Sequence, residues 1–226
     1  MQRLQGSAEL QLAQFDPMTW WPLGGLPAGS RLQGQARATW QVDGWQPLKG
    51  VAAVTLDLKD SQWLGSAFQL KAQADLPSLD VAQTPPAIAL DGQWGGNLFT
   101  VKSLGGSEPA WMAKVALTQS DVWAPLTDAL RWPRVQLQGE WQAQGLWRDP
   151  AQVQTEFKLR QMAAQGWQAQ GLQASWQTLA PGVRLDGAER LPSGLRLTAQ
   201  SLRWPGAKAG TEARHLAWQL VPEGPE

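Results

Sequence analysis

The sequence has no cysteine and no tyrosine, and it contains one histidine and one asparagine. Without cysteine, disulfide bonds and thiolate metal sites are excluded. The lone His215 cannot build a site with several histidine ligands, and no Gly-x-Ser-x-Gly nucleophile motif accompanies it. We interpret His215 as a solvated or structural residue. No phosphate-binding, dinucleotide or calcium loop occurs either, so we expect neither an enzyme nor a bound metal or cofactor.

Charge is also scarce, because Asp, Glu, Lys and Arg make up 17% of the chain, and 19 basic residues balance 19 acidic ones. This excludes the basic surface typical of nucleic-acid-binding proteins and a polybasic membrane patch. No uninterrupted apolar stretch is long enough to predict a membrane-spanning helix. Gln5, Glu9 and Gln11 interrupt the first fifteen residues, which therefore do not resemble a signal peptide.

Strict alternation of apolar and polar residues is the strongest pattern present. From Leu32 to Val42 the even positions are apolar or glycine, whereas the odd positions from Gln33 to Asp43 are polar. A period of two predicts a β-strand with one apolar and one polar face. The same alternation returns around residues 9–12, 54–59, 68–76, 136–143, 153–159, 195–199 and 216–220.

Glycine and proline separate these stretches at intervals of roughly ten residues, which is typical of an antiparallel meander. Helices are predicted only at residues 15–21 and 121–130, where Asp16 and Asp121 are expected to be N-caps. The predicted fold class is therefore all-β: an extended, curled antiparallel sheet with one or two short helices.

A weak internal repeat covers about residues 15–76 and 121–176. Each copy begins with a short helical stretch and continues through a Leu-Gln-Gly triplet, Leu32-Gln33-Gly34 in the first and Leu137-Gln138-Gly139 in the second. A Gly-containing turn, a further strand and a segment around Trp63 or Trp167 follow in both copies. We interpret 1–226 as one β segment made of such repeating units.

This order of elements resembles the TamB family (translocation and assembly module subunit), within the AsmA-like group of bacterial envelope proteins. The residues that carry the resemblance lie mainly at 15–76 and 137–176. It implies a β-taco, in which a long sheet curls around an apolar groove. It also implies a periplasmic protein anchored in the inner membrane, phospholipid or another apolar ligand as cargo, and a TamA-like outer-membrane partner. Because the anchor is missing, we expect this chain to be a piece of a longer protein.

The groove-lining candidates are the large apolar residues of the alternating stretches. They are Leu32, Trp40, Leu56, Leu58, Phe68, Leu70, Leu137, Trp141, Phe157, Leu159, Trp167, Leu195 and Leu197. In a closed sandwich the same residues would pack against a second sheet as an ordinary core. The alternation alone does not separate these two arrangements.

Four other interpretations remain open at this stage. The sheet edge of a structural or assembly protein could pair with client strands, as in β-augmentation. The chain could also be similar to the N subunit of type II secretion, a periplasmic β protein with a comparable pattern of Gly, Leu and Trp. Carbohydrate could stack on the tryptophans of turn-like segments, Trp20, Trp21 and Trp45. Two carboxylate pairs, Asp57 with Asp60 and Asp186 with Glu189, have the residue types of a glycosidase site but more often lie in turns.

Overall fold

The structure is a computed structural model of the chain, and it describes residues 3–17, 29–45, 48–79, 84–104, 110–129, 131, 134–149, 151–178 and 194–220. The chain divides into two compact units, Met1–Leu104 and Gly105–Glu226.

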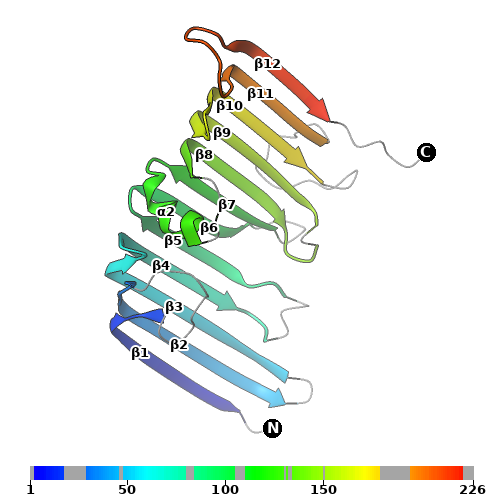
Figure 1. Cartoon of the computed structure of the whole chain (residues 1–226). Coiled ribbons are helices and arrows are strands. Elements are labelled where there is room, and N and C mark those ends of the chain that lie inside the picture. The colour runs from blue at the N-terminus through cyan, green and yellow to red at the C-terminus, as the bar shows by residue number, and fades with distance from the viewer. Residues whose placement is uncertain are drawn as a thin grey trace, which may run out of the picture. The chain divides into compact units, whose positions relative to one another are not determined.

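Among the described residues, each unit contains six strands, whose order along the chain is shown in Figure 1. The first unit holds β1 (Leu4–Phe15), β2 (Leu32–Trp45), β3 (Leu48–Trp63), β4 (Ser66–Leu76), β5 (Ala87–Trp94) and β6 (Asn97–Leu104). The second holds β7 (Ala110–Leu117), β8 (Val135–Leu146), β9 (Val153–Ala164), β10 (Trp167–Gln177), β11 (Gly194–Arg203) and β12 (Ala213–Leu220). Within a unit every strand pairs antiparallel with the strand that follows it in the sequence. The predicted fold class is confirmed: the protein is all-β, and its strands form an open, curled antiparallel meander.

The second unit also contains a short helical segment, the 3₁₀ helix η1 (Asp121–Trp123) followed by α2 (Ala124–Ala129). The prediction that Asp121 caps this helix is wrong. Ser120 occupies the N-cap position without a side-chain cap hydrogen bond, and Asp121 is already the first helical residue. A carboxylate in the first turn still faces the positive end of the helix dipole. The other expected helix, at residues 15–21, lies mostly outside the described residues, and Phe15 ends β1.

Tight hairpins join β3 to β4 and β9 to β10. Leu64 and Gly65 connect the first pair with φ angles of 50° and 81°, and Gln165 and Gly166 connect the second with 47° and 84°. Two successive positive φ angles are characteristic of the type I′ turn, whose twist matches that of the flanking strands. The two hairpins therefore use the same type of two-residue turn.

Gly34 and Gly139, the last residues of the two Leu-Gln-Gly triplets, adopt the same backbone conformation with a φ of 152°. A Cβ at Gly34 would overlap the backbone carbonyl oxygen of Asp57, and a Cβ at Gly139 would overlap that of Lys158. Each glycine is paired with a buried leucine, Leu58 or Leu159. The triplet glycine thus allows a close approach of two backbones that any side chain would prevent.

Replacing Gly34 by alanine is expected to lower the free energy of unfolding by about 3 kcal/mol or more, because positive-φ strain adds to a backbone clash. Gly139→Ala should have an effect of similar size. The matched control is Gly65→Ala, where φ is 81° and nothing lies within 4 Å of the added Cβ. The control should lose only about 1 kcal/mol. Urea denaturation measures all three, and equal losses at positions 34 and 65 would contradict the close approach.

An ion pair fastens the beginning of β1 to the end of β2. Arg3 Nε donates to Asp43 Oδ1 at 2.9 Å, and Gln41 Nε2 donates to both carboxylate oxygens of Asp43 at 3.1 Å. The hydrogen bond from Arg3, followed by that from Gln41, lowers the pKa of Asp43 below its usual value. Because Arg3 and Asp43 are both exposed, this contact affects the strand end and adds little to overall stability.

The lowered pKa of Asp43 predicts local fraying at acidic pH. The contact is complete above the unfolded-state pKa of about 3.9 and is lost as the pH falls through the lower folded-state pKa. In an antiparallel pair alternate N–H groups point toward the partner strand, so only one of Leu4 and Gln5 donates to β2. Its amide protection, corrected for intrinsic exchange, should therefore fall in strongly acidic solution before that of the residue six positions further along, Leu10 or Gln11. Asp43→Asn should remove this pH step, and a step that persists in that variant would assign it to another group.

Candidate apolar binding face

Cross-strand register lines up apolar residues on one side of the first unit. One row crosses all six strands through Leu12, Gly34, Leu58, Leu70, Gly92 and Phe99. The adjacent row runs through Leu10, Ala36, Leu56, Ala72, Leu90 and Val101. We call this side of each unit its apolar face. It is continuous because the period of two stays in phase from strand to strand.

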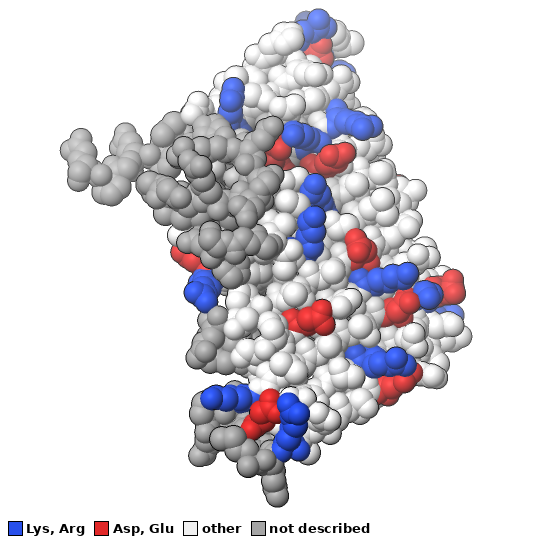
Figure 2. Space-filling model, turned by 180° about the vertical axis from the view of Figure 1, so that it is seen from behind, with Lys and Arg blue, Asp and Glu red and all other residues white. Residues whose placement is uncertain are grey.

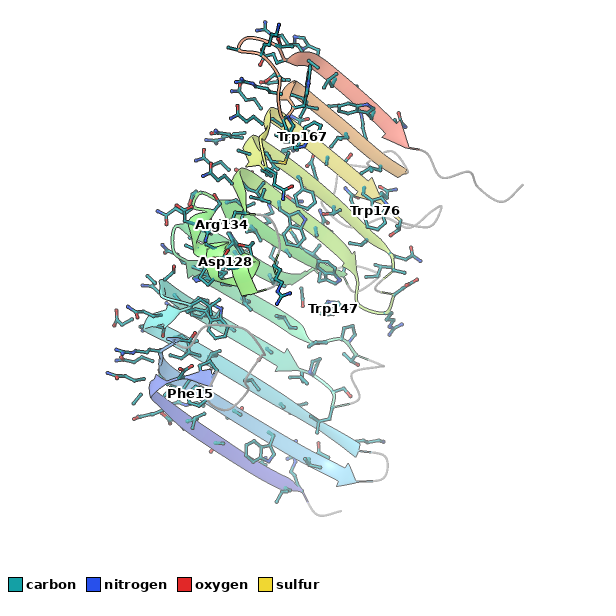
Figure 3. The ribbon with its side chains drawn as sticks, in the orientation of Figure 1. Phe15, Asp128, Arg134, Trp147, Trp167 and Trp176 are labelled. Atoms are coloured by element: carbon teal, nitrogen blue, oxygen red, sulfur yellow. The ribbon has the colours of Figure 1, made fainter. Side chains whose placement is uncertain are left out.

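The second unit has an apolar face with heavier side chains. One row runs from β7 to β12 through Val115, Trp141, Phe157, Ala174, Leu197 and Trp218. A neighbouring row contains Leu117, Gly139, Leu159 and Leu172. Trp167 and Trp176 lie toward the two ends of β10 (Figure 3).

All thirteen predicted residues lie on the apolar face of their unit, but their exposure differs widely. Leu58 and Leu159 are buried, with 4% and 7% of their surface exposed. Phe157, Trp167 and Leu195 remain 38%, 44% and 43% exposed. In the part of the chain that the structure describes, no second sheet faces these residues. Within that part, the apolar face is therefore not the inside of a sandwich.

Aromatic rings contact one another on the apolar face of each unit. Trp141 and Phe157 lie 6.0 Å apart between ring centroids, and Trp141 Nε1 donates to Thr155 Oγ1 at 2.7 Å. In the first unit Phe68 contacts Trp63 and Phe99, each at 6.3 Å. A tryptophan whose indole N–H is satisfied can sit at an apolar surface without an energetic penalty for the unpaired donor.

Two exposed tryptophans of this face, Trp176 and Trp218, are absent from the predicted set. Each is 47% exposed, more than any of the thirteen predicted residues. Their signal was present in the alternation, since Trp176 follows Leu172 and Ala174 at spacing two, and Trp218 follows Leu216. The register then places Trp176 opposite Leu195 and Trp218 opposite Leu197, which the sequence alone could not show.

The opposite face of each unit is polar and carries charges of both signs (Figure 2). In the first unit Gln35, Asp57, Lys71 and Asp91 are neighbours across β2 to β5 and border a shallow polar hollow of about 320 Å³. Opposite charges alternate along this row, which suits a solvated sheet surface.

Of the two carboxylate pairs, only Asp57 and Asp60 lie among the described residues. Asp57 Oδ2 and Lys59 Nζ form an ion pair at 3.0 Å, and Asp60 has a φ of 50° at the register shift of β3. Asp186, Glu189, Trp20 and Trp21 lie outside the described residues, as does the side chain of Trp45. His215 is exposed, with a φ of 52°.

Two further features, a metal site and a membrane-spanning helix, are absent from the described residues. No three of their His, Asp or Glu side chains are grouped so that they could hold a metal ion. None of their helical segments has the length and hydrophobicity needed to cross a bilayer. Comparison with known proteins yields no matching family, no matching curated protein and no matching solved structure. The apolar face is therefore the feature of this chain that points to a function.

The exposure of this face can be tested by substitution at two residues of β9. Phe157 and Leu159 share the face and lie two residues apart, but only Leu159 is buried. Leu159→Arg should lower the free energy of unfolding by about 4 kcal/mol, because it buries an unpaired charge. Phe157→Arg should cost about 1 kcal/mol, because the guanidinium reaches water. Denaturation curves measure both, and equally severe losses would mean that Phe157 is covered in solution.

Proposed function

We propose that this chain is a lipid-handling module that shelters the acyl chains of a phospholipid, or of a similar amphiphile, on its apolar face. Following the TamB-like order of its elements, we place it in the periplasmic part of an inner-membrane-anchored envelope protein. There it would take part in phospholipid transport between the two membranes or in outer-membrane protein assembly, with a TamA-like partner.

The observation that carries the proposal is the uncovered apolar face of the second unit. Phe157, Trp176, Leu195 and Trp218 are neighbours or near neighbours through the register of β9 to β12, and each is more than one-third exposed. Large contiguous apolar patches are rare on soluble proteins and mark sites of binding. A ligand that covers them gains roughly 25 cal/mol for each Å² of apolar surface removed from water.

The dimensions of the face suit acyl chains. Six strands at about 4.8 Å spacing make each unit roughly 24 Å wide across the sheet. The acyl part of one leaflet is about 15 Å thick, half of a ~30 Å hydrocarbon core. One lipid can therefore lie on the face of a single unit with its headgroup at the rim.

Tryptophan at both ends of β10 favours an amphiphile over a wholly apolar ligand. Trp167 and Trp176 are nine positions apart, which corresponds to roughly 30 Å of extended strand. Both are nearly half exposed. An indole combines a large apolar ring with an N–H donor, and it is favoured where acyl chains meet headgroups. The smaller residues between them, Ala169, Leu172 and Ala174, leave room for a chain.

The experiment measures transfer of a fluorescent phospholipid from vesicles to the purified chain, and native mass spectrometry identifies what stays bound. Replacing both Phe157 and Trp218 by arginine should reduce the bound fraction about tenfold or more, because the contact loses two large apolar side chains. The control is Gln173→Arg, which places one arginine on the polar face of β10 beside Ala174.

Circular dichroism must first show that the double variant keeps its β-structure. Loss of lipid in the folded double variant together with normal binding by Gln173→Arg supports the proposal. If the folded double variant binds as well as the unmodified chain, or if neither binds, the apolar face is not a lipid site.

A further inference from the structure

The connection between β11 and β12 has a sequence that fixes its backbone shape. Residues 204–207 form a β-turn, closed by a hydrogen bond from Ala207 N to Trp204 O at 3.2 Å. Its second residue is Pro205 and its third is Gly206, with a φ of 78°, which is characteristic of a type II turn. A second turn, over residues 208–211, follows directly and is closed by a hydrogen bond at 3.0 Å.

The first of these turns lies beside the β9–β10 hairpin, at the end of the sheet that carries Trp167 (Figure 1). A Cβ at Gly166 in that hairpin would meet Pro205 at 3.3 Å. The register of β10 with β11 runs as far as Arg203, and one step further brings Trp204 level with Trp167. Trp167 is 44% exposed and Trp204 is 39% exposed. We call this end of the sheet the Trp167 rim, which consists of residues 165–168 and 203–212.

Arg203 brings a cation to the Trp167 rim. It is the last residue of β11, and its Nη2 donates to Ala207 O at 3.3 Å. Because Ala207 lies beyond the end of the strand, this bond holds the guanidinium at the rim while its other N–H groups are available to a further acceptor. The planar fork of a guanidinium matches the oxygen atoms of a phosphate.

The other charges of the Trp167 rim leave it positive. Lys208 is exposed, and it forms no ion pair with the described residues. Glu212 is the one carboxylate in the rim sequence, and its Oε1 is bound by Arg214 Nε at 2.7 Å. The charge of Glu212 is therefore compensated from outside the rim, whereas Arg203 and Lys208 remain without a carboxylate.

The opposite end of β10 offers less to a headgroup. Trp176 is exposed there, with Leu195 opposite it. On β11 the cation nearest to Trp176 is Arg196, which lies level with Ser175 and Gln219 on the polar face. Its side chain therefore leaves the sheet on the side away from the acyl chains. Among the described residues, the arrangement better suited to a phosphate is at the Trp167 rim.

We propose that the bound lipid is an anionic phospholipid, oriented with its phosphate on Arg203 and its acyl chains running along the apolar face toward Trp176. Lys208 adds a second positive charge, so a headgroup without a cation of its own is favoured over a zwitterionic one. The inference rests on the proposed lipid-handling function, and it adds the charge class and the orientation of the lipid.

The experiment compares two lipids that have the same acyl chains and differ in the headgroup. Phosphatidylglycerol and diacylglycerol are offered to the complete chain at equal concentration from micelles of an uncharged detergent. Gel filtration followed by lipid extraction measures how much of each remains bound. Charge-assisted hydrogen bonds to the phosphate should favour phosphatidylglycerol about tenfold. Arg203→Gln should remove this preference, whereas Arg203→Lys keeps the charge and should retain part of it.

Arg196→Gln is the matched control, because it removes the same charge from the same strand on the polar face. The preference for phosphatidylglycerol should persist in this variant, and circular dichroism checks that all variants keep their β-structure. If Arg196→Gln removes the preference and Arg203→Gln does not, the headgroup lies at the Trp176 end and the assigned orientation is wrong.

Lys208→Gln tests the charge class separately. The unmodified chain should bind phosphatidylglycerol better than phosphatidylcholine with the same acyl chains, because the choline ammonium is repelled by Lys208. This difference should shrink in Lys208→Gln. Equal binding of the two phospholipids by the unmodified chain would overturn the anionic class.

The outcomes also separate this inference from the function on which it rests. If the unmodified chain binds phosphatidylglycerol and diacylglycerol equally, or if Arg203→Gln weakens both by the same factor, the lipid-handling function stands and the inference is overturned. If neither lipid binds, both are overturned. Inorganic phosphate at about 10 mM should leave phosphatidylglycerol bound, because acyl chains on the face keep the headgroup at a high effective concentration. Displacement at that concentration would identify the rim as a site for free anions.

Discussion

Cross-strand register is the constraint on which the other features of the structure depend, because a slip by one residue moves every side chain of a strand to the opposite face. The row from Val115 to Trp218 exists only because five successive pairings keep the same phase. Gly34 and Gly139 help to fix that phase, since each permits a backbone contact that a side chain would block. Where the phase does change, the strand has a bulge, as near Asp60.

The faces of the strands could be predicted from the sequence, but the degree of burial on each face could not. Alternation from Leu32 to Asp43 predicts β2, which the structure extends by two residues to Trp45. The same pattern assigns Phe157 and Leu159 to one face and treats them alike. Their exposure differs because it depends on the neighbouring strands, and Leu159 lies beside Gly139 while Phe157 lies beside Trp141. Pairing of distant residues is not encoded in a local period.

Local irregularities were the other part that the sequence did not reveal. Gln14, Asp60, Gln165 and His215 have positive φ angles although none is glycine. Such conformations are rare for residues with a Cβ and are imposed by the turn or bulge in which the residue lies. The start of η1 was also misplaced by one residue, because Ser120 and not Asp121 occupies the N-cap position. Serine and aspartate are both favoured at an N-cap, so the residue types alone do not decide between them.

A sheet with an uncovered apolar face must take its stability mainly from contacts between neighbouring strands. Buried residues such as Leu58, Leu159 and Ala199 lie where cross-strand neighbours crowd together, and the exposed Phe157, Trp176 and Trp218 contribute less. Stability of this kind is local, as in repeat proteins, where each element depends on the next. A ligand that covered the exposed side chains would therefore supply burial that the neighbouring strands of a single sheet do not provide.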